Sequence, residues 1–227
     1  MERAFIATLL SASLLLGTIA NAQTTIPVDD WQLRRDRDGI QVYSGDVAGS
    51  PYDAVRTITV IDDTSLSALV ALITDAESCP NWADRCEESY IVDQQNPKQA
   101  LVYTHNDLPF PIMDRDVVSQ IQWQQDPVSR MVSMESHAVA GVVEEKRGRL
   151  RLTHADVSWY FTPLSDSRVE VKNIAHIDPG SALPGWVTNM LLVDTPFETV
   201  RALRDEIRKD NYRDASVPFL VEPARPR

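Results

Sequence analysis

The chain is short of positive charge. Its 227 residues include 22 Lys and Arg against 33 Asp and Glu, which leaves a formal net charge of −11 at pH 7. An excess of negative charge argues against binding to nucleic acids and against a standing attraction to anionic lipid surfaces. We therefore expect no nucleic-acid partner.

Cysteine is also scarce, with only Cys79 and Cys86, seven residues apart. Two thiols with no nearby histidine leave a zinc shell half empty, and the Cys-x-x-Cys spacing of a redox dithiol is absent. In an exported chain the first interpretation is a disulfide that closes this short loop, and two free thiols are the alternative.

Motifs for common chemistry are missing too. The sequence has no Gly-x-Ser-x-Gly, no phosphate loop and no dinucleotide fingerprint. Its four histidines (His105, His137, His154 and His176) form neither a His-x-His nor a His-Glu-x-x-His pair. We expect no metal and no cofactor, and no spacing points to a carboxylate pair for acid–base work.

The N-terminus carries an apolar segment with a cleavage pattern. Residues 5–20 are almost wholly apolar or small, and Ala20-Asn21-Ala22 matches the small-x-small site of a secretory signal peptide. The run is too short and too interrupted for a stable membrane span. We predict a signal peptide at 1–22, a single domain at 23–212, and a periplasmic or secreted protein.

Periodicity after the leader predicts an α+β arrangement. A brief helix at 28–37 precedes strands at 40–44 and 54–61, and a helix at 66–73 follows the capping sequence Asp62-Asp63-Thr64. Six further strands are expected at 88–93, 99–106, 115–124, 131–137, 148–162 and 168–178. The end of the chain, 213–227, is rich in proline and is expected to be loosely ordered.

The last long segment, 184–209, predicts one amphipathic helix. Its apolar residues recur at spacings of three and four, namely Trp186, Met190, Val193, Phe197, Val200, Leu203 and Ile207. Midway, Thr195-Pro196-Phe197-Glu198 has the form of a helix start, which predicts a kink or break at Pro196. Such a helix must lie on a large apolar partner, and the strands before it provide a sheet.

The segment 106–115 is an apolar loop stiffened by proline. Loops normally face water, so Leu108, Phe110, Ile112 and Met113 need something to cover. The interior faces of the strands present a related ambiguity, because the periodicity of Ile121, Trp123, Trp159 and Phe161 does not distinguish a solid core from a lined cavity.

Five motifs in order resemble the steroidogenic-acute-regulatory-related lipid-transfer (START) family. They are Trp31 with Asp38-Gly39-Ile40, Tyr103-Thr-His with Asp114-Arg-Asp-Val117, Trp159 with Pro163, Asp178-Pro-Gly180, and Pro184 with Trp186, Asn189 and Pro196. The resemblance covers nearly the whole chain after the leader. It implies a helix-grip fold, in which a curved antiparallel sheet wraps around the C-terminal helix. It also implies an internal hydrophobic cavity for one lipid (sterol, fatty acid or phospholipid), gated by 106–115 and the final helix.

On this resemblance we predict a set of lipid-binding residues. They are Asn106, Leu108, Phe110, Met113, Arg115, Ile121, Trp123, Met134, Trp159, Phe161, Val171, Asn173, Trp186, Met190, Leu191 and Phe197. Asn173 is an amide on an otherwise apolar face, so it needs either a structural partner or a ligand head group. We expect a monomer that makes transient membrane contact.

The family pattern is broken at one pair of positions. Sterol-binding relatives place an acidic residue where this chain has Asn106 and a basic partner where it has Ile121, which puts sterol specificity in doubt and indicates a neutral pocket. Arg115 and Asp116 match the family's Arg-Asp pair, for which a loop-anchoring ion pair is an equal alternative.

Two other functions remain open from the sequence. Helix-grip relatives include cyclases and hydrolases, and His105, Glu135 and His137 would be the candidate acid–base groups. The apolar loop would otherwise serve as a contact within a membrane protein complex. If two of the three residues His105, Glu135 and His137 lay inside the cavity, the enzyme would be favoured. An interior filled by side chains would favour the role as a contact within a membrane complex.

Overall fold

A computed structural model describes residues 26–28, 30–165 and 167–223. Ten strands form one sheet in the order β1-β2-β3-β10-β9-β7-β6-β5-β4, with the short β8 beside β6. Every pairing is antiparallel except that of β8 with β6. The strands are β1 Gln32–Arg37, β2 Ile40–Gly45, β3 Ala54–Asp62, β4 Cys86–Asn96, β5 Gln99–Asn106, β6 Asp114–Gln125, β7 Val132–Ala138, β8 Arg149–Arg151, β9 Ala155–Ser165 and β10 Arg168–Ile177.

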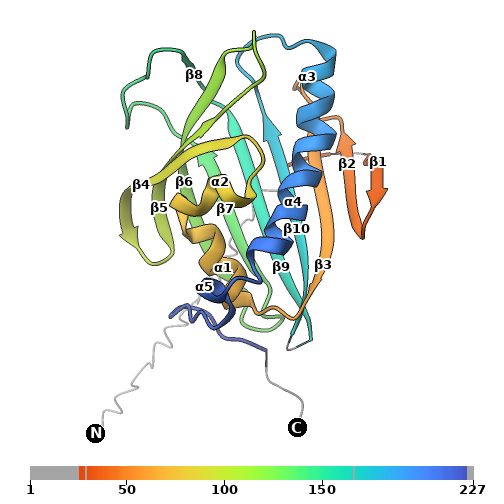
Figure 1. Ribbon diagram of the computed structural model, residues 1–227, viewed down its shortest axis with the longest axis vertical. Helices are drawn as coiled ribbons and strands as arrows, with labels where there is room; N and C mark the ends of the chain where they lie inside the picture. Colours follow the sequence, from red (N-terminus) through yellow and green to blue (C-terminus); the bar gives the residue numbers. More distant parts are fainter. Residues whose placement is uncertain (1–25, 29, 166, 224–227) are drawn as a thin grey trace, which may run out of the picture.

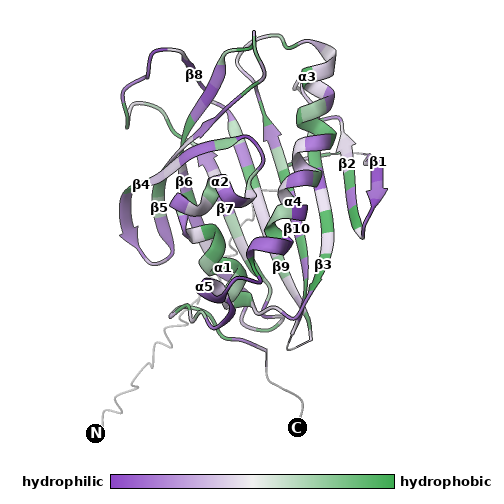
Figure 2. Ribbon diagram, in the orientation of Figure 1, coloured by the Kyte–Doolittle hydropathy of each residue, from purple (hydrophilic) through white to green (hydrophobic). Residues whose placement is uncertain are grey.

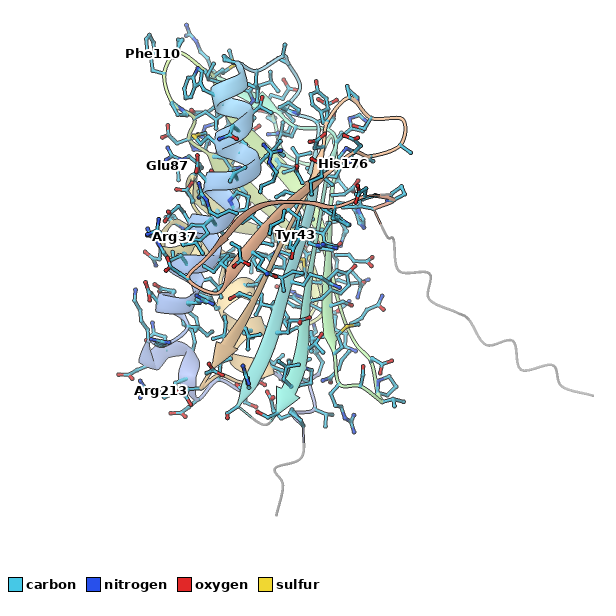
Figure 3. All side chains as sticks on the ribbon, turned by 90° about the vertical axis from the view of Figure 1, so that its right-hand side faces the viewer. Arg37, Tyr43, Glu87, Phe110, His176 and Arg213 are labelled. Carbon is cyan, nitrogen blue, oxygen red and sulfur yellow. A yellow bond between two sulfur atoms is a disulfide. The ribbon has the colours of Figure 1, made fainter. Side chains whose placement is uncertain are left out.

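The helices gather on one face of this sheet. Figure 1 shows α1, α2 and the long C-terminal helix in front of the strands, and Figure 3, turned by 90°, shows the helix and the sheet as separate layers. The elements are α1 Leu66–Thr74, the 3₁₀ turn η1 Ala76–Ser78, α2 Cys79–Trp82, α3 Gly185–Asn189, the π-helical η2 Met190–Asp194, α4 Thr195–Glu206 and α5 Asp210–Arg213. The α+β class and the curved sheet with a long C-terminal helix are as predicted.

One apolar cluster holds the lower half of the helix layer to the sheet. Trp82 meets Trp159 edge to face with 6.1 Å between ring centroids, and Phe161 stacks between Trp123 and Trp159. Leu203 and Ile207 of α4 and the apolar face of α1 belong to the same cluster. Figure 2 shows α1 as hydrophobic along its length, whereas the outer hairpin of β4 and β5 is largely hydrophilic. Burial of this cluster supplies the main stabilisation of the fold.

Three local predictions are wrong. The segment 28–37 contributes strand β1 in place of a helix, because it pairs with β2 from Gln32 to Arg37. The predicted strand 148–162 is divided into β8 and β9, which pair with different neighbours. The cap of α1 is Ser65, whose hydroxyl accepts the N–H of Ala68 at 3.0 Å.

The C-terminal helix runs through Pro196 without a break. The proline is accommodated by the π-helical turn η2 directly before it, where the N–H of Thr195 donates to the carbonyl of Met190, five residues earlier. Thr195 itself has helical angles (φ −58°, ψ −48°) and does not act as an N-cap. A π turn inserts an extra residue, so the faces on its two sides are rotated relative to a regular helix.

The predicted loose tail is packed as far as the structure follows it. Val217, Phe219 and Leu220 contact the apolar cluster. The Glu222 carboxylate accepts the N–H groups of Leu66 (3.2 Å) and Ser67 (2.7 Å). These N–H groups at the start of α1 have no partner within the helix, which explains why the tail is held there. The predicted signal peptide, 1–22, lies outside the described residues.

A buried polar cluster covers the convex side of the sheet. Asp116 is fully buried, accepts two hydrogen bonds from Arg151 (2.8 and 3.0 Å) and accepts one from the Tyr103 hydroxyl (2.9 Å). Arg149 donates to the Tyr103 hydroxyl at 2.6 Å. Because Arg151 also donates to the carbonyls of Val143 and Glu144, this cluster holds the 139–148 loop against the sheet.

Candidate functional site

A cavity of about 620 Å³ lies beneath the N-terminal half of the C-terminal helix. Its floor comes from β3 and β10, and its rim comes from the loops before β3, before β4, before β6 and after β10. The lining residues are Pro51, Tyr52, Asp53, Val55, Asp84, Arg85, Asn106, Leu108, Arg115, Leu152, Asn173, Ala175, Ile177, Pro179, Ala182, Leu183, Thr188, Leu191, Leu192, Thr195, Pro196, Thr199 and Val200. This volume lies within the range of about 300–1,000 Å³ typical of small-molecule sites.

Side chains therefore fill one end of the space between the C-terminal helix and the sheet, and the cavity occupies the other end. The large aromatic residues fill the end near α1, whereas Val55, Asn173 and Ala175 leave room at the end near α3. Val55 and Ala175 face each other across the β3–β10 pairing. Short side chains at opposed positions of the sheet create the hollow directly.

Most of the helix residues that face the cavity are not those of the predicted stripe. Seven residues of the final helix line the cavity, and only Val200 among them belongs to the stripe: Thr188, Leu191, Leu192, Thr195, Pro196, Thr199 and Val200. Trp186 is 55% exposed and Met190 is half-buried. The π-helical turn between Met190 and Asp194 shifts the register, so regular 3.6-residue counting from Phe197 selects the wrong residues before the turn.

The loop before β4 joins the helix to the rim. The Thr195 hydroxyl donates to Oδ2 of Asp84 at 2.8 Å, and the Asp84 backbone N–H donates to Oγ1 of Thr199 at 3.0 Å. The carbonyl of Arg85 accepts the N–H of Asp107, the first residue of the apolar loop, at 2.9 Å. Cys79 and Cys86 form the predicted disulfide around this segment, so it is held at both ends.

The loop 107–113 turns one apolar residue inward and others outward. Leu108 is buried and lines the cavity, and its N–H donates to Oδ1 of Asp114 at 3.1 Å. Burial raises the pKa of Asp114, but hydrogen bonds from the Leu108 N–H and from His105 lower that pKa further, to below its ordinary value. Phe110 and Met113 are 95% and 53% exposed, and Figure 3 shows Phe110 at the end of the molecule where α3 begins.

Arg115 and Asp116 do not form an ion pair. They are successive strand residues and point to opposite faces, so Asp116 meets Arg151 on the convex side while Arg115 lines the cavity. Arg115 is only 5% exposed, and it donates from Nε to the Pro179 carbonyl (3.2 Å) and from Nη2 to Oγ of Ser181 (2.9 Å). It thereby links the start of β6 to the loop after β10.

Gly180 gives that loop its shape. Its φ of +75° is in the left-handed region, and a Cβ there would lie 2.5 Å from Cδ2 of Leu150. Its N–H donates to Oδ1 of Asp178 at 2.8 Å. A residue with a side chain would displace the segment that holds the partners of Arg115.

Five of the predicted lipid-binding residues line the cavity: Asn106, Leu108, Arg115, Asn173 and Leu191. Six others lie in or against the solid apolar cluster: Ile121, Trp123, Met134, Trp159, Phe161 and Val171. Phe197 packs against Ile40 and Val42 beside the cavity, and Phe110, Met113, Trp186 and Met190 are at the surface or half-buried outside the lining. The predicted set left out Val55, Ala175 and Leu192, which also line the cavity. Ala175 was detectable, because it continues the alternating face of Val171 and Asn173.

The three candidate acid–base residues are absent from the lining. His105 contacts Asp114 at 2.9 Å, and His137 contacts Asp156 at 2.7 Å with Glu135 at 3.9 Å. Within the described ranges, no group of three or more His, Cys, Asp or Glu side chains is arranged to hold a metal ion. Among those same residues, no helix has the length and apolar character needed to cross a membrane.

A family model described as the START domain matches residues 20–209. The chain belongs to the START family. A curated relative, the uncharacterized protein PA1579 of Pseudomonas aeruginosa, is 28% identical over 198 residues, which cover 87% of this chain and 95% of the relative.

Solved START structures share the architecture. The crystal structure of a STAR-related lipid transfer protein fragment from Xanthomonas axonopodis is 27% identical with a TM-score of 0.72, covering 80% of this chain and all (100%) of that one. Human STARD10 has a TM-score of 0.70 at 16% identity, covering 80% of this chain and 74% of that chain. The helix-grip fold is thus a property that this chain shares with its START relatives.

Proposed function

We propose that this START protein binds one hydrophobic lipid-like ligand, such as a sterol, fatty acid or phospholipid, and transfers it between membranes. The observation that carries the proposal is the cavity of about 620 Å³ between the C-terminal helix and the sheet. Burial of several hundred Å² of apolar ligand surface gains on the order of 10 kcal/mol at about 25 cal/mol per Å², before the costs of binding. A partly open, largely apolar cavity therefore suffices to hold a lipid without covalent chemistry.

The loop 107–113 and the C-terminal helix act together as the gate in this proposal. Leu108 from the loop and Leu191, Leu192 and Thr195 from the helix line the same space. The π-helical η2 lies where the helix covers the cavity, and π turns inside α-helices occur frequently at functional sites. Movement of this segment would open the cavity between the helix and the loop.

The open end of the site supplies the membrane contact. Phe110, Met113 and Trp186 are exposed by 95%, 53% and 55%. Exposed apolar and aromatic residues of this kind insert into the interface of a bilayer, where tryptophan is favoured. Because the net charge of −11 repels anionic lipids, we expect docking to uncharged, zwitterionic bilayers.

We propose that the protein acts as a monomer outside the cytoplasm, in the periplasm or as a secreted protein. The predicted signal peptide supports export, and the Cys79–Cys86 disulfide fits an oxidising compartment. Mass spectrometry of the exported protein tests this, with a mature chain that begins at Gln23 as the expected result. An uncleaved, cell-retained protein would contradict it.

Binding is tested by filling the cavity from its floor, at Ala175 of β10. Ala175→Trp places a large side chain in the hollow and should abolish binding of a fluorescent fatty acid while the fold is retained. Val128→Trp, at a position 89% exposed, is the matched control and should bind as the wild type does. Native mass spectrometry of the purified protein should show one lipid per chain. A wild type that carries no lipid and binds no probe would refute the proposal.

The cyclase or hydrolase alternative needs polar groups that face the ligand. Its candidates, His105, Glu135 and His137, lie outside the lining, so nothing in the cavity favours them as acid–base groups. The role as a contact within a membrane complex needs a filled interior, which the hollow under α3 does not supply. Both observations support binding without chemistry as the first function to test.

A further inference from the structure

Arg115 is a buried cation beside an apolar space. Its side chain lines the cavity with Leu108, Leu152 and Leu183, and only 5% of the residue is exposed. Burial of a positive charge is unfavourable unless an opposite charge compensates it.

The partners of Arg115 are all neutral. Its guanidinium donates to the carbonyls of Met113 and Pro179 and to the hydroxyl of Ser181. A guanidinium has five N–H groups, so two of them, one on each terminal nitrogen, are left without an acceptor among the residues that the structure describes. In the same part of the chain, no carboxylate lies within 4.0 Å of it.

The other charges of the lining do not compensate Arg115. Asp84 pairs with Arg85 at 3.3 Å. Asp53 shares a hydrogen bond with Asp46, and burial and the charge of Asp46 raise its pKa. Burial lowers the pKa of Arg115, with partial opposition from Asp114, as expected for a desolvated cation. Arginine nevertheless stays protonated in proteins, so its positive charge persists in the cavity.

Asn106 adds a second donor at the same place. It pairs with Arg115 across β5 and β6, lines the cavity, and its side-chain amide makes no hydrogen bond to another described residue. We propose that the Arg115 guanidinium and the Asn106 amide bind the anionic head group, a carboxylate or phosphate, of a single-chain lipid. The hydrocarbon chain of that lipid then lies along Val55, Ala175 and Leu192. This inference rests on the proposed lipid-binding function and replaces the neutral pocket that the sequence indicated.

Displacement of the uncharged probe N-phenyl-1-naphthylamine measures how strongly the cavity prefers a lipid with an anionic head group to one with an uncharged head group. Hexadecanoic acid, hexadecyl phosphate and hexadecanol share one chain and differ in the head group. A charge-assisted hydrogen bond contributes about 1.5–3 kcal/mol, so the wild type should bind both anions at least ~10-fold more tightly than the alcohol. Arg115→Gln should remove this preference and leave the affinity for hexadecanol within about 2-fold of the wild type.

Arg204→Gln is the matched control. Arg204 also donates to backbone carbonyls, those of Asp38 and Gly39, but it lies outside the lining. This variant should lose stability and keep the preference for anions. Arg115→Lys, which keeps the charge but loses the planar fork, should retain part of the preference.

Each outcome decides between distinct possibilities. Equal binding of acid and alcohol by the wild type overturns the anionic subsite and leaves the lipid-binding function intact. Equal loss of acid and alcohol in Arg115→Gln makes Arg115 a structural clamp and overturns the subsite as well. Displacement of the probe by acetate or inorganic phosphate alone would mean a site for small anions, which also overturns it. Failure of the probe and all three lipids to bind refutes the proposed function itself.

If Arg115→Gln does not fold, the wild-type ratio of acid to alcohol and the Arg115→Lys variant still decide the question. A ratio near one overturns the subsite. A ratio of about 10 or more that falls in Arg115→Lys supports it.

Discussion

The hydroxyl of Thr195 donates a hydrogen bond of 2.8 Å to Oδ2 of Asp84. Thr195 directly follows the π-helical turn, and Asp84 lies inside the disulfide-closed loop, so this bond joins the roof of the cavity to its rim. The adjacent Arg85 carbonyl accepts the N–H of Asp107 from the apolar loop. The two parts of the proposed gate, the C-terminal helix and the apolar loop, are thus connected through the neighbouring residues Asp84 and Arg85.

Asp84→Ala should therefore loosen the gate. Loss of this hydrogen bond should reduce the free energy of unfolding by about 1–2 kcal/mol and speed the release of a bound fluorescent fatty acid several-fold. Stopped-flow dissociation measures the release. Thr195→Val removes the same bond from the other side, and the double variant should show non-additive effects.

Asp62→Ala is the control for Asp84→Ala. Asp62 pairs with Arg168 at 3.0 Å, and both side chains are more than half exposed, 68% and 56%. An ion pair of this kind contributes about 0–1 kcal/mol, so release should be unchanged. Release from Asp84→Ala at the wild-type rate would show that this hydrogen bond does not restrain the gate.

Removal of the disulfide should destabilise the same region. Cys79→Ser with Cys86→Ser frees a loop of seven-residue separation, for which chain entropy predicts a loss of about 2–3 kcal/mol. Thermal unfolding of the double variant, compared with the wild type under oxidising and reducing conditions, measures the effect. Reduction should lower the Tm of the wild type only. An identical Tm for both proteins under oxidising conditions would contradict the structural role.

Asp116 should make the fold sensitive to acid. Burial raises the pKa of its carboxyl, but hydrogen bonds from Arg151 and Tyr103 lower that pKa further, so it lies below the ordinary value of 3.8. A carboxyl with a lower pKa in the folded state stabilises the protein above its unfolded pKa, and this contribution is lost as the pH falls through the folded pKa. The free energy of unfolding should therefore decline below pH 3.8.

Asp116→Asn tests this dependence through urea unfolding at a series of pH values. The variant leaves Arg151 buried without its ion-pair partner, which should cost about 3–5 kcal/mol at neutral pH and flatten the acid slope. Tyr103→Phe removes one hydroxyl and keeps the ring, so it should cost about 1 kcal/mol and keep most of the slope. An unchanged acid slope in Asp116→Asn would assign the acid sensitivity to other carboxyls.

Glu222 should stabilise α1 from the far end of the chain. Its carboxylate accepts two N–H groups of the first helical turn, so Glu222→Ala should lower the free energy of unfolding by about 1 kcal/mol. Glu222→Gln keeps one acceptor oxygen without the charge and should be intermediate. Differential scanning calorimetry measures both. A Glu222→Ala variant with the wild-type Tm would return the tail to the loosely attached state expected from its prolines.

Local chemistry was sufficient to predict most elements of the fold. The alternating residues of β10 and the three-and-four spacing of α4 arise from backbone geometry, which a sequence displays directly. The Cys79–Cys86 disulfide was predicted from the short spacing of the two cysteines together with the expected export of the chain. The helix predicted at 28–37 failed because pairing with β2 outweighs a weak local preference.

What the sequence by itself determined is therefore the α+β class, the amphipathic final helix and the apolar character of the loop 106–115, since each depends on neighbouring residues only. Tertiary structure decided which part of the interior is hollow. Trp159 and Phe161 fill one end and Ala175 leaves room at the other, because a void depends on side chains that meet from distant strands. It also decided that Arg115 stays unpaired beside the cavity, because its neighbours Pro179 and Ser181 come from a loop 64 and 66 residues away.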